Sequence, residues 1–86
     1  MKATDHFVYI LKCADGTLYT GYTTDIKKRI DEHNGVGNKP GARYTRGRRP
    51  VALVYQEEWP TRSKAQQREC AIKTLPRGDK LQLCGL

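Results

Sequence analysis

The sequence predicts an α+β fold in which a three-stranded antiparallel sheet is flanked by helices. Three short segments are rich in the β-branched and aromatic residues that favour strands: residues 7–13, 17–23 and 51–57. Two other segments, residues 24–34 and 64–74, carry apolar residues at helical spacing. The predicted order is therefore ββαβα, with the helices packed on a single sheet.

The length and the charge of the chain restrict what it can be. The chain has 86 residues, with 16 Lys and Arg against 9 Asp and Glu, so its formal net charge is +7. We expect one domain over residues 1–86, with a core from about residue 5 to residue 81. The longest apolar runs are five residues, whereas a membrane-spanning helix needs about 20. The start of the chain lacks the apolar stretch of a secretory signal, so we expect a cytoplasmic protein without a membrane partner. The positive charge favours an anionic partner such as nucleic acid.

Residues 7–13 and 17–23 are expected to form a β-hairpin, because Asp15-Gly16 between them is a strong turn signal. The length of the loop decides which side chains share a face of the sheet. A two-residue loop would put the side chains of Tyr9 and Tyr19 on opposite faces.

A three-residue loop with Gly16 in the left-handed conformation gives a different register. Tyr9 then pairs with Gly21, and the phenols of Tyr9 and Tyr19 lie on the same face. We expect this longer loop, in which Gly21 leaves space for a bulky group opposite Tyr9.

The first helix follows the hairpin, and Ile26 and Ile30 lie on its apolar face. It is expected to begin near Thr23 or Thr24, where a hydroxyl can cap the free N–H groups. Asn34-Gly35 is expected to end it.

Residues 35–50 hold five basic residues, four glycines, two prolines and no acidic residue. This composition indicates a loop, with room for one helical turn around Tyr44. The third strand is expected at residues 51–57, before Pro60.

The second helix is expected at residues 64–74. Ser63 and Gln66 have the spacing of a capping box at its start, and Pro76 and Gly78 are expected to end it. No structure is assigned to the tail that follows.

Several side chains can do chemistry, although each also has a simpler explanation. Tyr9 and Tyr19 are ordinary strand residues that pack in a core. Arg29 and His33 are four residues apart and are therefore neighbours on one helix surface. Taken singly, Arg29 is explained as a solvated charge and His33 as a residue favoured near a helix C-terminus.

Glu69 is the only carboxylate of the second helix and lies at the edge of its apolar face. A carboxylate beside a core needs a cation or a metal as a partner. A salt bridge with Arg62 or Lys73, both within helical reach, is the simpler explanation.

The order and the spacing of these residues resemble the GIY-YIG nuclease superfamily. The resemblance extends from Phe7 to about Leu81. The positions that carry it are Phe7-Val8-Tyr9, Tyr19-Thr20-Gly21, Arg29, His33, and Glu69 within the pattern A-x-x-x-E-C-A-I-K. The segment GARYT at residues 41–45 is similar to small single-domain bacterial members, and the chain is also similar to the nuclease domain of structure-selective endonuclease subunits.

The resemblance implies hydrolysis of a DNA phosphodiester by water, with a single divalent ion, Mg²⁺ or Mn²⁺. Arg29 would stabilise the negative charge of the transition state. Glu69 would hold the ion, since a hard cation can be bound through one carboxylate and several waters. Tyr9 is the first choice for relaying the proton of the water, with Tyr19 and His33 as alternatives. The implied setting is DNA repair or recombination.

The basic loop is expected to contact DNA, with its cations on phosphates and its tyrosine stacked on an unpaired base. The residues concerned are Lys39, Arg43, Tyr44, Arg46, Arg48 and Arg49. A solvated loop is the simpler explanation of such a charge run. We expect DNA as the partner, with branched or damaged DNA as the candidate substrates. Because we expect a single domain without a separate recognition domain, we also expect low sequence specificity, or recruitment by a protein partner that supplies specificity. The alternative function is a weakly active or inactive nucleic-acid-binding module of the same fold.

Overall fold

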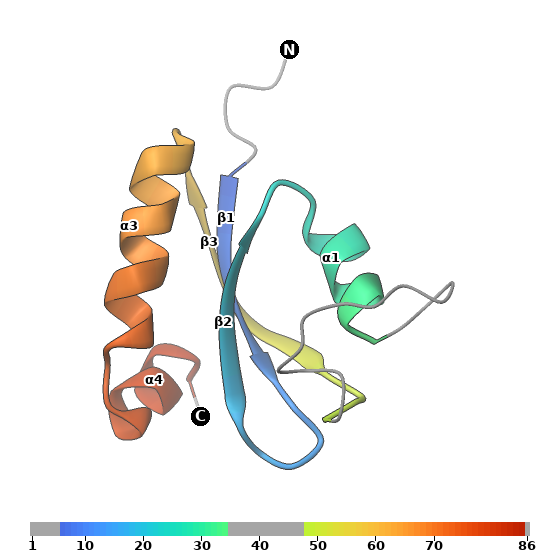
Figure 1. The fold of residues 1–86 in the computed structure, drawn as a ribbon. Coiled ribbons are helices and arrows are strands. Elements are labelled where there is room, and N and C mark those ends of the chain that lie inside the picture. The colour runs from blue at the N-terminus through green and yellow to red at the C-terminus, as the bar shows by residue number, and fades with distance from the viewer. Residues whose placement is uncertain (1–5, 35–47, 86) are drawn as a thin grey trace.

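The protein has the predicted α+β fold, with three strands in one antiparallel sheet and helices on both faces (Figure 1). The computed structural model describes residues 6–34 and 48–85. The elements in chain order are β1 (His6–Lys12), β2 (Leu18–Thr23), α1 (Ile26–His33), β3 (Ala52–Trp59), α3 (Arg62–Lys73) and α4 (Arg77–Leu83). In Figure 1 the sheet is seen with β2 in front, with α1 on one side and α3 and α4 on the other.

The strand order is β2-β1-β3, so β1 is the central strand and β2 is an edge strand. Successive side chains of β1 lie on opposite faces of the sheet and therefore contribute to two separate cores. Val8 and Ile10 are completely buried against Ala65 and Ile72 of α3. Burial of such a side chain contributes about 1.5–3 kcal/mol, so this core holds α3 against the sheet.

The second core lies between the opposite face of the sheet and α1. Tyr9 and Leu11 of β1 are buried there, and Ile26 and Ile30 of α1 pack against them. The predicted apolar face of the first helix is thus confirmed.

The predicted three-residue hairpin loop is confirmed. The N–H of Cys13 donates a hydrogen bond of 2.8 Å to the carbonyl of Thr17, which closes the loop. Gly16 has φ 85°, the left-handed conformation that a side chain would strain. As a result Tyr9 pairs with Gly21 across the two strands.

The start of α1 differs from the prediction. Thr23 ends β2, and its hydroxyl accepts a 3.1 Å hydrogen bond from the N–H of Asp25. The Asp25 carboxylate, rather than a threonine hydroxyl, accepts from the N–H of Lys28 and caps the helix. The prediction that the helix ends at Asn34 is confirmed.

The predicted capping box at Ser63 is wrong, because α3 begins earlier. The hydroxyl of Thr61 accepts a 3.1 Å hydrogen bond from the N–H of Lys64. Ser63 therefore lies inside the first turn of the helix. The preceding strand, β3, extends to Trp59 and ends immediately before Pro60.

The tail contains a helix, α4, that the sequence did not indicate. Pro76 takes the N-cap position of α4 with extended backbone angles, and Gly78 lies within the helix instead of preventing one. A proline is well tolerated at a helix start because the N–H that it lacks would have no intrahelical partner. Leu83 and Cys84 pack against the core beside α3.

The helical turn expected around Tyr44 lies outside the described residues. Among the helices that the model describes, none is long and apolar enough to cross a membrane.

A candidate active site beside the edge strand

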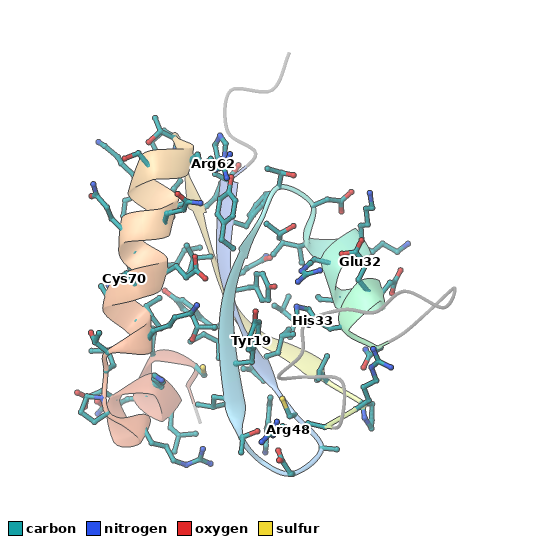
Figure 2. The ribbon with its side chains drawn as sticks, viewed as in Figure 1. Tyr19, Glu32, His33, Arg48, Arg62 and Cys70 are labelled. Atoms are coloured by element: carbon teal, nitrogen blue, oxygen red, sulfur yellow. The ribbon has the colours of Figure 1, made fainter. Side chains whose placement is uncertain are left out.

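Three aromatic rings from three different elements meet on the α1 side of the sheet. Tyr9 comes from β1, Tyr19 from β2 and His33 from α1, and their ring centroids lie 5.1–6.4 Å apart. A hydrogen bond of 2.9 Å joins the Tyr9 hydroxyl to Nε2 of His33. Figure 2 shows Tyr19 and His33 between β2 and α1. The fold therefore brings the two phenols together, as the register predicts, and adds the imidazole to them.

Gly21 allows the phenol of Tyr9 to lie across the edge strand. A Cβ atom at Gly21 would overlap the Tyr9 hydroxyl and would come within 3.0 Å of Cε2 of Tyr19. The space that the sequence indicates opposite Tyr9 is therefore occupied by the phenol of Tyr9 itself. The Tyr9 hydroxyl thus lies over the backbone of β2, at the rim of the sheet.

Both members of the Tyr9–His33 pair are neutral at neutral pH. Burial, together with electrostatic interactions with Tyr19 and Glu69, raises the pKa of Tyr9 to about 12, although the nearby guanidinium of Arg29 opposes the rise. Burial and the positive charge of Arg29 lower the pKa of His33 to about 4. The 2.9 Å hydrogen bond therefore joins a phenol to an uncharged imidazole.

Arg29 is held beside the Tyr9–His33 pair by the carboxylate of Glu32, a residue that sequence reasoning did not single out. Its Nη1 donates to Oε1 of Glu32 at 2.9 Å. Burial tends to lower the pKa of Arg29, but the bond to Glu32 and the nearby Tyr9 phenol raise it above its usual value. Arg29 is therefore a partnered, partly buried group rather than a freely solvated charge. The signal in the sequence was the i,i+3 spacing of Arg29 and Glu32.

The C-terminal end of α1 is fixed to the start of β3. The side-chain oxygen of Asn34 accepts from the N–H of Val51 at 2.7 Å, and its amide nitrogen donates to the carbonyl of Val51 at 3.2 Å. Nε of Arg49 donates to the carbonyl of His33 at 2.6 Å. These bonds set the position of His33 relative to the sheet.

Two of the residues predicted to contact DNA are described, and both have partners within the protein. Arg49 bonds the backbone of α1, and Nε of Arg48 donates to Oδ2 of Asp15 at 3.0 Å. The Arg48–Asp15 pair is exposed, so water can exchange with it. The other members of the predicted set, Lys39, Arg43, Tyr44 and Arg46, lie outside the described residues.

Glu69 lies on α3, on the opposite face of the sheet from α1. Its carboxylate is mostly buried and pairs with Nζ of Lys73 at 3.0 Å, which is the simpler of the two expectations for this residue. Its negative charge nevertheless contributes to the raised pKa of Tyr9, whose hydroxyl lies over the intervening strand β2. The fold thus gathers Tyr9, Tyr19, Arg29 and His33 on one side of β2, with Glu69 on the other.

The position of Glu69 follows from the packing of its neighbour on α3. Arg68 donates from Nε and Nη2 to the carboxylate of Glu57 on β3, at 2.9–3.1 Å. Because successive helical residues are 100° apart, Arg68 reaches β3 while Glu69 takes the side of α3 nearer β2.

Within residues 6–34 and 48–85, no group of three or more His, Cys, Asp or Glu side chains is placed to hold a metal ion.

The comparisons with known proteins agree with this fold. The family model described as the GIY-YIG catalytic domain matches residues 5–82. The chain therefore belongs to the GIY-YIG family, a family of nucleases.

Relatives within this family are small proteins of similar length. A UPF0213 protein of Staphylococcus saprophyticus is 58% identical over 78 residues, which are 91% of this chain and 92% of the relative. The solution structure of a UPF0213 protein of Bacillus halodurans has a TM-score of 0.59 and 46% identity, and the match covers 93% of this chain and 82% of that one. A solution structure of an E. faecalis protein matches with a TM-score of 0.60 and 42% identity, over 94% of this chain and 82% of that one.

Proposed function

We propose that the protein is an endonuclease that hydrolyses DNA phosphodiester bonds with one divalent ion, Mg²⁺ or Mn²⁺. The observation that carries the proposal is the convergence of Tyr9, Arg29 and His33 in one cluster at the edge strand, in which Tyr9 is hydrogen-bonded to His33 and lies beside the guanidinium of Arg29. Membership of a nuclease family and the net charge of +7 support it. Branched and damaged DNA are the substrates that we would test first.

Arg29 is suited to stabilise the transition state. Negative charge spreads over the phosphoryl oxygens as the bond is cleaved, and a guanidinium can donate two parallel hydrogen bonds to it. Glu32 holds the guanidinium in place, beside the Tyr9 phenol. Its side chain is still 30% exposed, which leaves it accessible to a phosphate.

Tyr9 and His33 are suited to move a proton together. The attacking water gives its proton to the Tyr9 oxygen while the Tyr9 hydroxyl passes its own proton to Nε2 of His33, 2.9 Å away. This relay avoids a free tyrosinate, which a pKa of about 12 makes costly. The negative charge of a bound phosphate raises the pKa of a nearby imidazole, so His33 accepts the proton most readily when substrate is present.

Glu69 would hold the divalent ion. Its carboxylate supplies the hard oxygen ligand that Mg²⁺ and Mn²⁺ prefer, and such ions commonly retain several waters when one carboxylate binds them. Binding would require the Lys73 ammonium, now 3.0 Å from the carboxylate, to move aside. When bound, the ion would lower the pKa of a coordinated water and neutralise charge on the phosphate.

The test is cleavage of single-stranded, duplex, flap and junction DNA with Mg²⁺ or Mn²⁺. We expect cleavage by the wild-type protein, lost in Glu69→Ala and in Arg29→Ala. Matched controls remove the same charges elsewhere: exposed Asp79 on α4 and exposed Lys28 on α1, so Asp79→Ala and Lys28→Ala should cleave normally.

Two results would contradict the proposal. Metal-independent cleavage that survives Glu69→Ala would show that Glu69 does not support the reaction through an ion. Tight, salt-sensitive DNA binding without cleavage of any substrate would instead favour a nucleic-acid-binding module of the same fold.

A further inference from the structure

Three side chains from three elements stack on the α3 side of β2, away from the Tyr9–His33 pair. The rings of His6 and Tyr22 are nearly parallel, with centroids 6.1 Å apart, and a 2.8 Å hydrogen bond joins Nδ1 of His6 to the Tyr22 hydroxyl. The guanidinium carbon of Arg62 lies 6.0 Å from the centre of the Tyr22 ring. Figure 2 shows Arg62 at the start of α3, beside the strands.

Arg62 differs from Arg68 and Lys73 of α3 in its partner. Arg68 pairs with Glu57 and Lys73 pairs with Glu69, so their charges are balanced. Among the described residues, no carboxylate forms a salt bridge with Arg62, and its guanidinium lies over the face of the Tyr22 ring. A guanidinium can stack on an aromatic face while the N–H groups at its edge donate elsewhere.

The position of Arg62 relative to Glu69 is set by the helix. The two residues are seven apart, which is two turns, so they share one side of α3 about 10 Å from each other along the axis. Gln66 lies between them on the same side. A shallow groove of about 610 Å³ runs beside this side of the helix, and its lining includes one cation and no carboxylate: Arg62, Ser63, Gln66, Gln67 and Cys70.

We propose that Arg62, held over the ring of Tyr22, is a second phosphate-binding residue for the DNA strand that is cut. At a rise of about 3.4 Å per nucleotide, the spacing to Glu69 corresponds to about three nucleotides. Arg62 then binds a phosphate on the α3 side of β2, a few nucleotides along the strand from the bond that is cleaved. This inference rests on the proposed function for its choice of ligand.

The test compares two variants of the first turn of α3 that remove the same charge. The side chain of Arg62 lines the groove, whereas exposed Lys64 does not. Binding of a fluorescent flap DNA is measured by anisotropy over a range of salt, without divalent ions so that no cleavage occurs. We expect Arg62→Ala to weaken binding about 10-fold and to reduce the slope of log affinity against log salt by about 0.9. Lys64→Ala should leave the slope unchanged.

Variants of Tyr22 test whether the ring holds the guanidinium. Tyr22→Phe keeps the aromatic face, so binding should be unchanged, whereas Tyr22→Leu should weaken binding toward the level of Arg62→Ala. Thermal unfolding of each variant verifies that the fold is retained.

A double-mutant cycle locates the phosphate. Single phosphates of the DNA are replaced by neutral methylphosphonates at successive positions. With the wild-type protein one replacement, about three nucleotides from the cut, should weaken binding about 10-fold, and with Arg62→Ala the same replacement should have no further effect.

The outcomes separate this inference from the proposed function. If Arg62→Ala and Lys64→Ala change affinity and slope equally, or if the cycle is additive at every phosphate, Arg62 is not a phosphate-binding residue. Failure of the nuclease proposal appears differently, as DNA binding without cleavage by the wild-type protein. Absence of DNA binding by the wild-type protein would overturn both.

Discussion

Gly21 decides where the Tyr9 hydroxyl can lie. The two residues are paired in neighbouring strands, and the phenol crosses the edge strand at the only type of residue that has no Cβ. The backbone of Gly21 is not in the left-handed region that favours glycine, because the described glycines with positive φ are Gly16 and Gly85. The requirement at this position is therefore for space and not for an unusual backbone conformation.

We predict that Gly21→Ala disables cleavage. The new Cβ would overlap the Tyr9 hydroxyl, so the phenol must leave its hydrogen bond with His33. We expect at least a 100-fold loss of cleavage rate, since a small displacement of a catalytic group has effects of this size, and a loss of about 1–3 kcal/mol in the free energy of unfolding. Gly78→Ala is the control, because a Cβ at Gly78 meets nothing within 4 Å in helix α4, and it should stabilise the protein slightly. Normal cleavage by Gly21→Ala would contradict the placement of Tyr9 in the site.

We predict that His33 makes the stability of the protein sensitive to acid. The pKa of His33 is lowered in the folded state from 6.5 to about 4 by burial and by nearby Arg29. Between pH 6.5 and pH 4, His33 therefore binds a proton in the unfolded chain but not in the folded protein. The free energy of unfolding is therefore not reduced by this effect above pH 6.5. As the pH falls toward 4, it decreases by up to about 3 kcal/mol.

The measurement is urea unfolding across this pH window, with the two histidines compared. His33→Gln should remove the pH dependence, whereas His6→Gln should retain it. The His6→Gln protein also leaves a single imidazole for NMR, and its ring signals should not titrate above about pH 5.5. An imidazole that titrates near pH 6.5 in this variant would rule out the neutral Tyr9–His33 pair.

At the scale of elements, α1 depends on contacts at its two ends. Asp25 caps its N-terminus, and Asn34 joins its C-terminus to the backbone of Val51 at the start of β3. Val51 is buried, so both of its backbone groups need a partner. Because Asn34 directly follows His33, this junction also sets the distance between the imidazole and the sheet.

We predict a graded effect at Asn34. Asn34→Ala leaves two backbone groups of Val51 without their partners and should cost about 1–3 kcal/mol of stability. Asn34→Asp keeps the acceptor for the Val51 N–H but loses the donor to the carbonyl, so its effect should be smaller. Cleavage rate should fall in the same order, and a fall in rate at unchanged DNA affinity would identify a positioning role. Equal stability of all three proteins would show that the junction is unimportant.

The elements themselves were largely predictable, and the errors have physical causes. Asp15-Gly16 fixed the register of the hairpin because a left-handed glycine closes a three-residue loop. The helix starts were misplaced because neighbouring residues, such as Thr23 and Asp25, can all act as caps and only the folded backbone selects one. Helix α4 was missed because Pro76 and Gly78 suggest a break, although a proline can also begin a helix.

The contacts within the candidate site were only partly predictable. The tyrosine pair follows from the register. The partnership of Tyr9 with His33 does not, because it depends on how α1 packs on the sheet. Arg49 was expected to face DNA, but it bonds the backbone of α1, a role that spacing along the chain cannot reveal.

At the scale of the whole molecule, two small cores share one sheet. A chain of this length has a total stability of about 4–13 kcal/mol, so one core residue is a large fraction of it. Completely buried Ile72 is in the core that holds α3, and with it Glu69.

We predict that Ile72→Ala lowers the free energy of unfolding by about 2–5 kcal/mol, by loss of burial and formation of a cavity. Leu53→Ala is the control, since Leu53 is 37% exposed, and it should lower stability by only about 1 kcal/mol because its side chain is only partly buried. Urea unfolding followed by circular dichroism measures both. Equal, small losses would mean that the α3 core contributes little to the fold.

The edge position of β2 has a consequence for how a polymer reaches the Tyr9 hydroxyl. In the part of the chain that the structure describes, this strand pairs with β1 alone, and the phenol of Tyr9 lies over its backbone. A long chain can therefore be laid along the rim from the side and does not have to be threaded through an opening by a free terminus. Under the proposed function, a covalently closed circle should be cut as readily as a linear molecule that carries the same structure.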